Sequence, residues 1–359
     1  MEFVTLAEAG EPSGIRKIDA SSERITYNPK MSQGSTFLSC PICGAHAAED
    51  VWQDDVWQLV RCADCSVVYL ANPPNEEELA ALYSFESGFH TELLDQSAAI
   101  EDADRTAQQH LAELAKIVTG GSLLDIGCST GRFVAAAKQA GFEAQGVELN
   151  PDTAEIARGS GLNVTTGTLA DVQAEQRSFD AITMWDIVEH VPDPIDVLSR
   201  ARELLSDEGW LWLTTPNIDG LFPQTSLRVA NTVGKWPHPE PPYHLTQFSA
   251  QTITDALQRS GFDQVVIKHQ CIPLSYSFGS AMKMLTDPRR LAYAAAFAPL
   301  AFLGPHVHRG DTLMVAAKPG PAEVGAIDLR KQEPVADLTE SATTPHLEMP
   351  GSPSRSLQQ

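Results

Sequence analysis

The sequence predicts an α/β fold built on an open, mostly parallel sheet, and three observations indicate it. Residues 123–126 form an apolar segment that enters a glycine-containing turn, Gly127 to Gly131, and then a helical pattern. A second apolar segment ends at Glu148. Further apolar segments alternate with helical patterns, which is typical of parallel strands joined by crossover helices. These later segments are 179–186, 210–217, 265–268 and 312–317.

The first turn and the acid that follows it indicate a ligand that contains a ribose. Ligands of open α/β sheets lie beyond the carboxyl ends of the strands, at the switch point of the topology. Glu148 follows the turn by about twenty residues, where a carboxylate accepts hydrogen bonds from both ribose hydroxyls. A dinucleotide fingerprint needs glycines where this chain has Ser129 and Arg132, and no Lys-Ser/Thr pair follows Gly131. A cofactor with ribose and adenine but no phosphate fits better, and S-adenosylmethionine is such a cofactor.

The order of the later segments resembles a known family. The strand pattern 179–186 ends in Trp-Asp, and a Glu-His-Val-Pro-Asp-Pro stretch, a helical pattern at 195–205 and the strand pattern 210–217 follow it. Over roughly residues 100–318 these blocks resemble the class I S-adenosylmethionine-dependent methyltransferases, in the small-molecule branch with the ubiquinone-pathway O-methyltransferases. The resemblance implies a Rossmann-like, seven-stranded methyltransferase sheet with helices on both faces. The family often has a third glycine where this chain has Ser129.

The resemblance also implies which residues contact the cofactor. The turn would run alongside the methionine moiety, and Asp125 would polarise that site. Glu148 would accept hydrogen bonds from the ribose hydroxyls. Residues 167–169 would flank the adenine together with Leu149, and Trp185 and Asp186 would close the pocket near the methionyl amino group. A solvated loop position for Glu148 and a helix N-cap role for Asp186 are the alternatives. The cofactor-binding residues predicted in this way are Asp125, Gly127, Cys128, Gly131, Glu148, Leu149, Thr168, Leu169, Trp185 and Asp186.

Two Cys-x-x-Cys pairs upstream predict a zinc site. Cys40 and Cys43 form the first pair, Cys62 and Cys65 form the second, and eighteen residues separate the pairs. Two such turns complete a tetrahedron of thiolates around one ion, and a site with four sulfur ligands is structural because no position stays open. Disulfides are the alternative. We find no signal peptide, and thiols stay reduced in the cytoplasm, so a cytoplasmic location and a metal are favoured.

Charge argues against nucleic acid as a partner. The chain has 25 Lys and Arg against 47 Asp and Glu, a net charge of −22, and Arg61 is the only Lys or Arg between Phe37 and Asn75. Lys and Arg contacts to phosphates supply most non-specific affinity for nucleic acids. An RNA methyltransferase with a zinc module is therefore the less favoured interpretation, and a small-molecule substrate is preferred.

Composition and pattern divide the chain into five parts. Residues 1–36 and 319–359 are predicted to be disordered tails, because they are rich in Ser, Pro and charged residues and lack periodicity. Residues 37–72 form the zinc-ribbon-like module, with a short hairpin between the cysteine pairs. Residues 73–118 form a helical linker or lid, with helices at 76–83 and about 99–118. Residues 119–318 form the Rossmann-like methyltransferase domain, with a helical insertion at 271–310.

Two histidines are candidates for a general base. Methyl transfer is an in-line displacement that requires positioning of the acceptor, and an oxygen acceptor can need a base to remove its proton. His190 follows the fourth strand of the predicted sheet, and His244 lies in a segment that resembles the family's histidine-leucine element. Packing or loop-anchoring roles are the alternatives. The sequence leaves open whether oxygen, carbon or nitrogen receives the methyl group.

The segment 289–303 is apolar and begins with two arginines. It is too short to span a bilayer, which needs about 20 residues. A helix covering the substrate end of the sheet is the preferred interpretation, and contact with a membrane surface or a lipophilic substrate is the alternative.

Two other classes of function compete with a methyltransferase that acts on a small-molecule, sugar-linked or lipophilic acceptor. A non-catalytic S-adenosylmethionine-binding or scaffold protein would keep the fold, but the intact Gly127, Gly131 and Glu148 argue against a decayed pocket. A nicotinamide-dependent oxidoreductase is opposed by Ser129 and Arg132.

Overall fold

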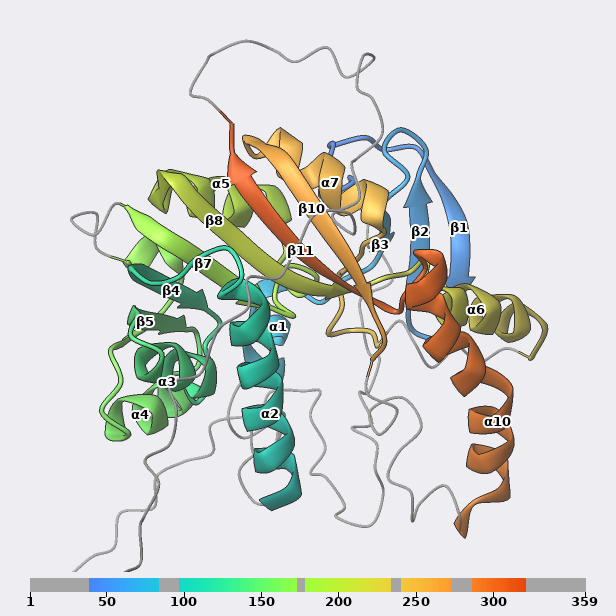
Figure 1. The fold of residues 1–359 in the computed structure, drawn as a ribbon. Helices are drawn as coiled ribbons and strands as arrows, with labels where there is room; N and C mark the ends of the chain where they lie inside the picture. The colour runs from blue at the N-terminus through green and yellow to red at the C-terminus, as the bar shows by residue number, and fades with distance from the viewer. Residues whose placement is uncertain (1–38, 84–96, 173–177, 234–239, 273–285, 321–359) are drawn as a thin grey trace, which may run out of the picture.

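A seven-stranded sheet forms the centre of the molecule (Figure 1). The computed structural model describes residues 39–83, 97–172, 178–233, 240–272 and 286–320. The strand order is β10-β11-β8-β7-β4-β5-β6. The strands are β4 (Ser122–Ile126), β5 (Glu143–Glu148), β6 (Val164–Thr166), β7 (Phe179–Trp185), β8 (Leu205–Pro216), β10 (Phe262–Gln270) and β11 (Thr312–Pro319). β4 to β8 pair in parallel, and β11 is antiparallel to both of its neighbours. The predicted seven-stranded α/β fold is confirmed.

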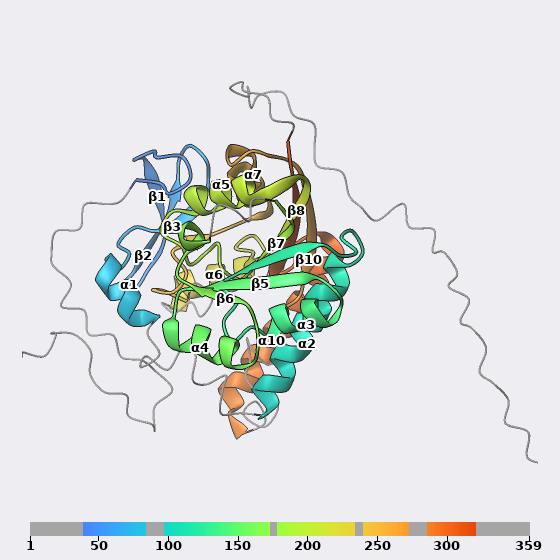
Figure 2. The ribbon, with the colours of Figure 1, turned by 90° about the vertical axis from the view of Figure 1, so that its left-hand side faces the viewer.

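Helices cover both faces of this sheet (Figure 2). Because successive side chains of a strand point to opposite faces, neighbours on β4 belong to different cores. Leu124 packs in one cluster with Leu198 of α5 (Pro194–Leu204) and Ile253 of α7 (Ala250–Arg259). Leu123 packs in another cluster with side chains of α2 (Ser97–Leu114) and α3 (Arg132–Gln139). The helix α4 (Pro151–Gly159) packs beside α3 on this second face.

The cysteine-rich module has its own small sheet, which one strand of the main domain completes. The predicted hairpin is formed by β1 (Ala48–Gln53) and β2 (Gln58–Cys62), and β3 (Val68–Leu70) pairs with β2. The fourth strand, β9 (Thr246–Gln247), comes from the segment after β8 and pairs with β3. Cys40, Val60 and Tyr69 also belong to the same apolar cluster as β4 and α7. The module is therefore packed into the core of the domain.

The remaining helices lie near the carboxyl ends of the parallel strands. The predicted helix at 76–83 is α1 (Glu76–Leu82), which Asn75 caps with a reciprocal bond to Glu78. In the predicted insertion, α10 (Pro288–Leu303) and the short helix η4 (Gly304–Val307) follow one another, and α10 packs on α6 (Leu221–Val233) through Phe222 and Phe297. The predicted tails fall almost wholly on residues 1–38 and 321–359, outside the described part of the chain, although β11 continues to Pro319. None of the described helices has the length and apolarity required to cross a membrane.

Candidate functional site

A large cavity opens at the switch point of the sheet, beyond the carboxyl ends of β4, β5 and β7. Its volume is about 1530 Å³, and it is bordered by Gly127, Glu148 and Asp186, each just after or at the end of one of these strands. The direction in which successive strands are added to the sheet reverses at this point, because β5 lies on one side of β4 and β7 lies on the other. The cavity therefore lies where an open α/β sheet is expected to bind its ligand.

The turn after β4 has a backbone that favours glycine. Gly127, Ser129 and Gly131 have φ angles of 69°, 50° and 79°, in the left-handed region. A Cβ atom on Gly127 would also overlap the side chain of Ile187. Ser129 adopts the conformation for which the family often uses glycine, and serine tolerates it at a modest energetic cost. The turn can therefore bring its backbone close to a ligand.

Glu148 is fixed by hydrogen bonds to both of its carboxylate oxygens. Oε2 accepts from the backbone amide of Ser129 at 2.9 Å, and Oε1 accepts from that of Asn150 at 2.9 Å. The side chain is only 6% exposed and borders the cavity. Each carboxylate oxygen has a second lone pair, so the group retains the capacity to accept bonds from a ligand.

Asp125 and Cys128 lie behind the turn and are not part of the described cavity lining. Asp125 is buried and accepts a 2.7 Å bond from the hydroxyl of Thr183, and burial raises its pKa to about 7. The Cys128 side chain is buried against Gly146, where an added Cβ would overlap the sulfur. We expect these two residues to support the turn from below and not to contact the cofactor directly.

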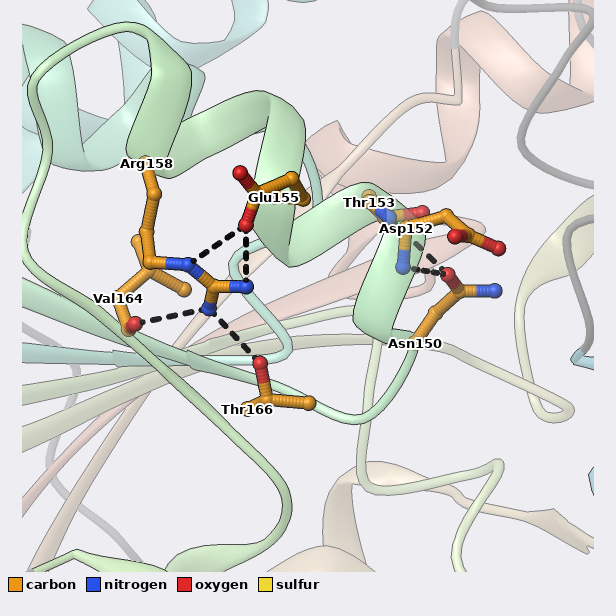
Figure 3. A network of polar contacts seen from close by, with 7 residues as sticks. All are labelled: Asn150, Asp152, Thr153, Glu155, Arg158, Val164 and Thr166. Atoms are coloured by element: carbon orange, nitrogen blue, oxygen red, sulfur yellow. Dashed lines mark hydrogen bonds and ion pairs between the residues drawn. The ribbon is translucent and has the colours of Figure 1, made fainter.

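The residues predicted to flank the adenine line one side of the cavity. Leu149 is 56% exposed and lines the cavity, where it leaves an apolar surface that a planar base can cover. Thr168 and Leu169 line the same side, where Thr168 caps the short helix η2 (Leu169–Asp171). Figure 3 shows that Arg158 bonds the carbonyl oxygen of Val164 and the hydroxyl of Thr166, which ties α4 to β6.

Trp185 and Asp186 form the end of β7. The Trp185 ring stacks on His110 of α2 at a centroid distance of 4.1 Å and meets Phe133 edge-on at 5.0 Å. Asp186 has a φ of 54°, and its backbone amide bonds the hydroxyl of Thr214. Its side chain is exposed within the open cavity, and desolvation by the surrounding protein raises its pKa. Burial of His110 lowers its pKa to about 4, so that ring is neutral at pH 7.

The two candidate histidines are brought together although they lie 54 positions apart in the sequence. The rings of His190 and His244 meet edge-on at 4.7 Å. Burial lowers the pKa of His190 to about 4 and that of His244 to about 3, so both are neutral at pH 7. Neutral imidazole is the form that can accept a proton.

Glu189 is buried and lies next to His190 and His244. Neither of its carboxylate oxygens has a hydrogen-bond partner among the described residues. Burial and the nearby Asp186 raise its pKa well above the ordinary value, which favours the neutral acid. Glu189, His190 and His244 each place one donor atom within 4.8 Å of the others, a spacing that a metal ion could also use. Nothing in the sequence distinguishes Glu189 apart from its position next to His190.

The four predicted zinc ligands converge at the base of the module. The sulfur atoms of Cys40 and Cys65 are 3.5 Å apart, as are those of Cys43 and Cys62, and all four lie within 4.8 Å of one another. A tetrahedron with metal–sulfur distances of about 2.3 Å has edges of about 3.8 Å. None of the four is in a disulfide. The donor set and spacing therefore fit a single zinc ion.

The central part of the chain matches a known family in sequence. Residues 99–267 match the family model described as "Methyltransferase domain". The resemblance to methyltransferases is therefore confirmed for this segment. The match covers α2 to most of β10, and the cysteine-rich module and β11 lie outside it.

Relatives of this domain include enzymes of ubiquinone biosynthesis. The ubiquinone biosynthesis O-methyltransferase of Xanthomonas campestris pv. campestris is 32% identical over 155 residues, which are 37% of this chain and 64% of that protein. The enzyme of the same name from Bordetella avium is 34% identical over 116 residues, 30% of this chain and 47% of that protein. The chain thus spans less than two thirds of the length of these relatives. A solved S-adenosylmethionine-dependent methyltransferase of Thermotoga maritima, described as a possible histamine N-methyltransferase, is 18% identical, with a TM-score of 0.44 over 64% of this chain and 97% of that one.

Proposed function

We propose that this protein transfers the methyl group of S-adenosylmethionine to a small-molecule acceptor. The observation that carries the proposal is the junction of the glycine turn with Glu148, at the switch point of a methyltransferase domain. The cavity beside this junction has room for a second molecule, because its volume of about 1530 Å³ exceeds the roughly 300–1,000 Å³ of ordinary ligand pockets.

The residues around the junction fit this cofactor. Glu148 offers carboxylate lone pairs for two ribose hydroxyls, and the exposed Leu149 offers an apolar surface for adenine. Asp186 offers a carboxyl group for the methionyl ammonium, whose charge would favour the ionised form that burial now disfavours. S-adenosylmethionine supplies an electrophilic methyl group. The chain's task is then to orient the acceptor in line with that methyl group and to exclude water.

We propose His190 and His244 as the general-base pair for an acceptor that must lose a proton. His190 borders the cavity, and burial keeps its ring neutral at pH 7. His244 packs against His190 and is 7% exposed, so it would hold the first ring in place. A ring with a lowered pKa is a weak base, so this pair suits an acidic acceptor such as a phenol.

The four cysteines are proposed to bind one structural zinc ion. Support comes from the free thiols and their tetrahedral spacing. We propose a cytoplasmic location on the same ground, because reducing conditions keep such thiols available for metal.

We propose that the chain is divided into the module at 37–72, the linker at 73–118 and the domain at 119–318. Nucleic acid is not expected as a partner, since the module carries Glu49, Asp50, Asp54, Asp55 and Asp64.

The acceptor is proposed to be a small, sugar-linked or lipophilic molecule. The relatives act in ubiquinone biosynthesis, as their names state, and the cavity wall includes apolar side chains such as Leu79, Ile187 and Ile218. Leu291, Phe302 and Leu303 at the two ends of α10 are about half exposed, which supports contact of 289–303 with a membrane surface or a lipophilic acceptor.

Calorimetry with S-adenosylmethionine, S-adenosylhomocysteine and NADH tests the proposal. We expect both methyl-cycle ligands to bind at micromolar concentration and NADH not to bind. Binding of both ligands without turnover of any acceptor in a broad screen would favour the non-catalytic binding protein. Absence of binding to folded, zinc-loaded protein would reject the proposed function.

A further inference from the structure

Tyr83, which follows α1, reaches the candidate histidines from a distant part of the chain. It is the C-cap residue of α1. Its hydroxyl lies 3.1 Å from Nδ1 of His190 and 3.3 Å from the carbonyl oxygen of Tyr243. Nδ1 of His190 lies 2.9 Å from the same carbonyl oxygen. Three segments of the chain therefore meet at one point on the cavity wall.

These three distances decide which nitrogen of His190 carries the proton. A carbonyl oxygen only accepts hydrogen bonds, so a contact of 2.9 Å requires Nδ1 to be protonated and to donate. The Tyr83 hydroxyl donates to the second lone pair of that oxygen. A bare Nδ1 would instead place two acceptors against each other at 2.9 Å. The lone pair of the neutral ring is therefore on Nε2, for which the described residues provide no hydrogen-bond partner.

The backbone of Tyr83 connects to the cofactor side of the cavity. Its carbonyl oxygen accepts a 2.8 Å bond from Nδ2 of Asn150. The backbone amide of Asn150 donates to Glu148, and its Oδ1 caps α4 by accepting from Asp152 and Thr153, as Figure 3 shows. Tyr83 and Asn150 together thus join the proposed ribose carboxylate to the proposed base. Residue 83 lies before the segment that matches the methyltransferase family, 99–267, so the similarity does not cover it.

We propose that Tyr83 is a positioning residue of this site, which holds His190 with Nδ1 protonated and the Nε2 lone pair available to the acceptor. The use of that lone pair rests on the proposed function, whereas the proton arrangement does not. The segment that follows the cysteine-rich module then completes the active site, and the module anchors it, because β3 also pairs with β9 next to His244.

Nitrogen-15 spectroscopy of the histidine rings tests the proposal in the full-length protein. His190→Asn identifies the His190 signals by their loss. In the wild type at pH 7, we expect Nδ1 of His190 in the protonated range and Nε2 in the unprotonated range. Tyr83→Phe keeps the aromatic ring and the backbone bond to Asn150 but removes the hydroxyl. In this variant we expect the Nδ1 and Nε2 signals of His190 to move toward each other, because the His190 ring is less firmly held and samples both tautomers.

Tyr69→Phe is the matched control, because Tyr69 is a buried tyrosine of the module on β3 and does not line the cavity. It should leave the His190 signals in place. Both tyrosine variants should bind S-adenosylhomocysteine with the affinity of the wild type. If the wild type did not bind this ligand, the proposed function would be rejected, but the positioning role of Tyr83 would not. A protonated Nε2 in the wild type would overturn the inference even if the variant failed to fold. Unchanged His190 signals in a folded Tyr83→Phe protein would overturn it as well.

Discussion

The backbone amide of Ser129 donates a 2.9 Å hydrogen bond to the carboxylate of Glu148, across the ends of β4 and β5. Ser129 itself has a left-handed φ of 50° within the turn. Because Asn150 donates to the other oxygen, Glu148 holds two turns and is itself held in one orientation. The glycine turn and Glu148, the residue proposed to bind the ribose, are therefore one structural unit. A substitution in either should alter the conformation of the other.

Replacing Glu148 with Gln should weaken S-adenosylhomocysteine binding by about ten- to hundredfold, because hydrogen bonds to a charged group contribute about 1.5–3 kcal/mol. The amide group of Gln would also face one of the two backbone amides as a second donor. Calorimetry measures the dissociation constant. Glu143→Gln, at the exposed start of the same strand, is the control and should bind normally. Equal affinity of the two variants would remove Glu148 from the cofactor site.

Replacing Gly127 with Ala should destabilise the fold by about 1–3 kcal/mol, the usual energetic cost of a strained backbone conformation. The added Cβ would also press on Ile187. Urea unfolding measures the change. Gly159, near the end of α4, has open space around its Cα and no left-handed φ, so Gly159→Ala should be neutral or slightly stabilising. If Gly127→Ala were as stable as Gly159→Ala, the turn would not need its glycine.

The purified protein should contain one zinc ion per chain, and Cys43→Ser should lose it. Cys43 shares its site with Cys40, Cys62 and Cys65, whereas Cys271 lies elsewhere, so Cys271→Ser should retain the metal. Elemental analysis measures the stoichiometry. Because the module shares a core with β4 and α7, chelation should also lower the thermal midpoint of the whole domain. A full metal content in Cys43→Ser would contradict the site.

Much of the fold could be predicted because its signals are local. The apolar segments at 123–126 and 179–186 and the turn at Gly127 to Gly131 coincide with β4, β7 and the start of α3. Asn150 followed by Pro151 is a strong local start signal for a helix, and Asn150 indeed caps α4. The four cysteines were predictable because metal-ligand spacing is visible in the sequence itself.

The parts that could not be predicted depend on contacts between distant segments. The pairing of β3 with β9 joins the module to residues more than 170 positions later, and no local pattern encodes such a pairing. Tyr83 and Glu189 reach the cavity only through tertiary packing. Asp125 was predicted from its place at the strand end, but whether its side chain faces the cavity or the core depends on β7, where Thr183 bonds it.

His190 should make the protein less stable as the pH is lowered from 7 to 5. The pKa of His190 is lowered to about 4 in the folded protein, whereas the value in the unfolded chain is 6.5. Between these two values the unfolded state binds more protons, so the free energy of unfolding rises with pH in this window. The contribution of His190 between pH 5 and pH 7 is about 2 kcal/mol. His110 and His244, whose pKa values are also lowered, contribute with the same sign. Burial raises the pKa values of Asp125, Asp186, Glu189 and Asp311, and these groups contribute with the opposite sign. His190→Asn retains a donor for the carbonyl oxygen of Tyr243 but cannot titrate, so this contribution should be absent from its free energy of unfolding over this range.

Urea unfolding at pH 5 and pH 7 measures the difference between the wild type and the variant. His46→Asn, at an exposed position of the module, should behave like the wild type. An identical change of stability with pH in the wild type and in His190→Asn would show that His190 is not buried as a neutral ring.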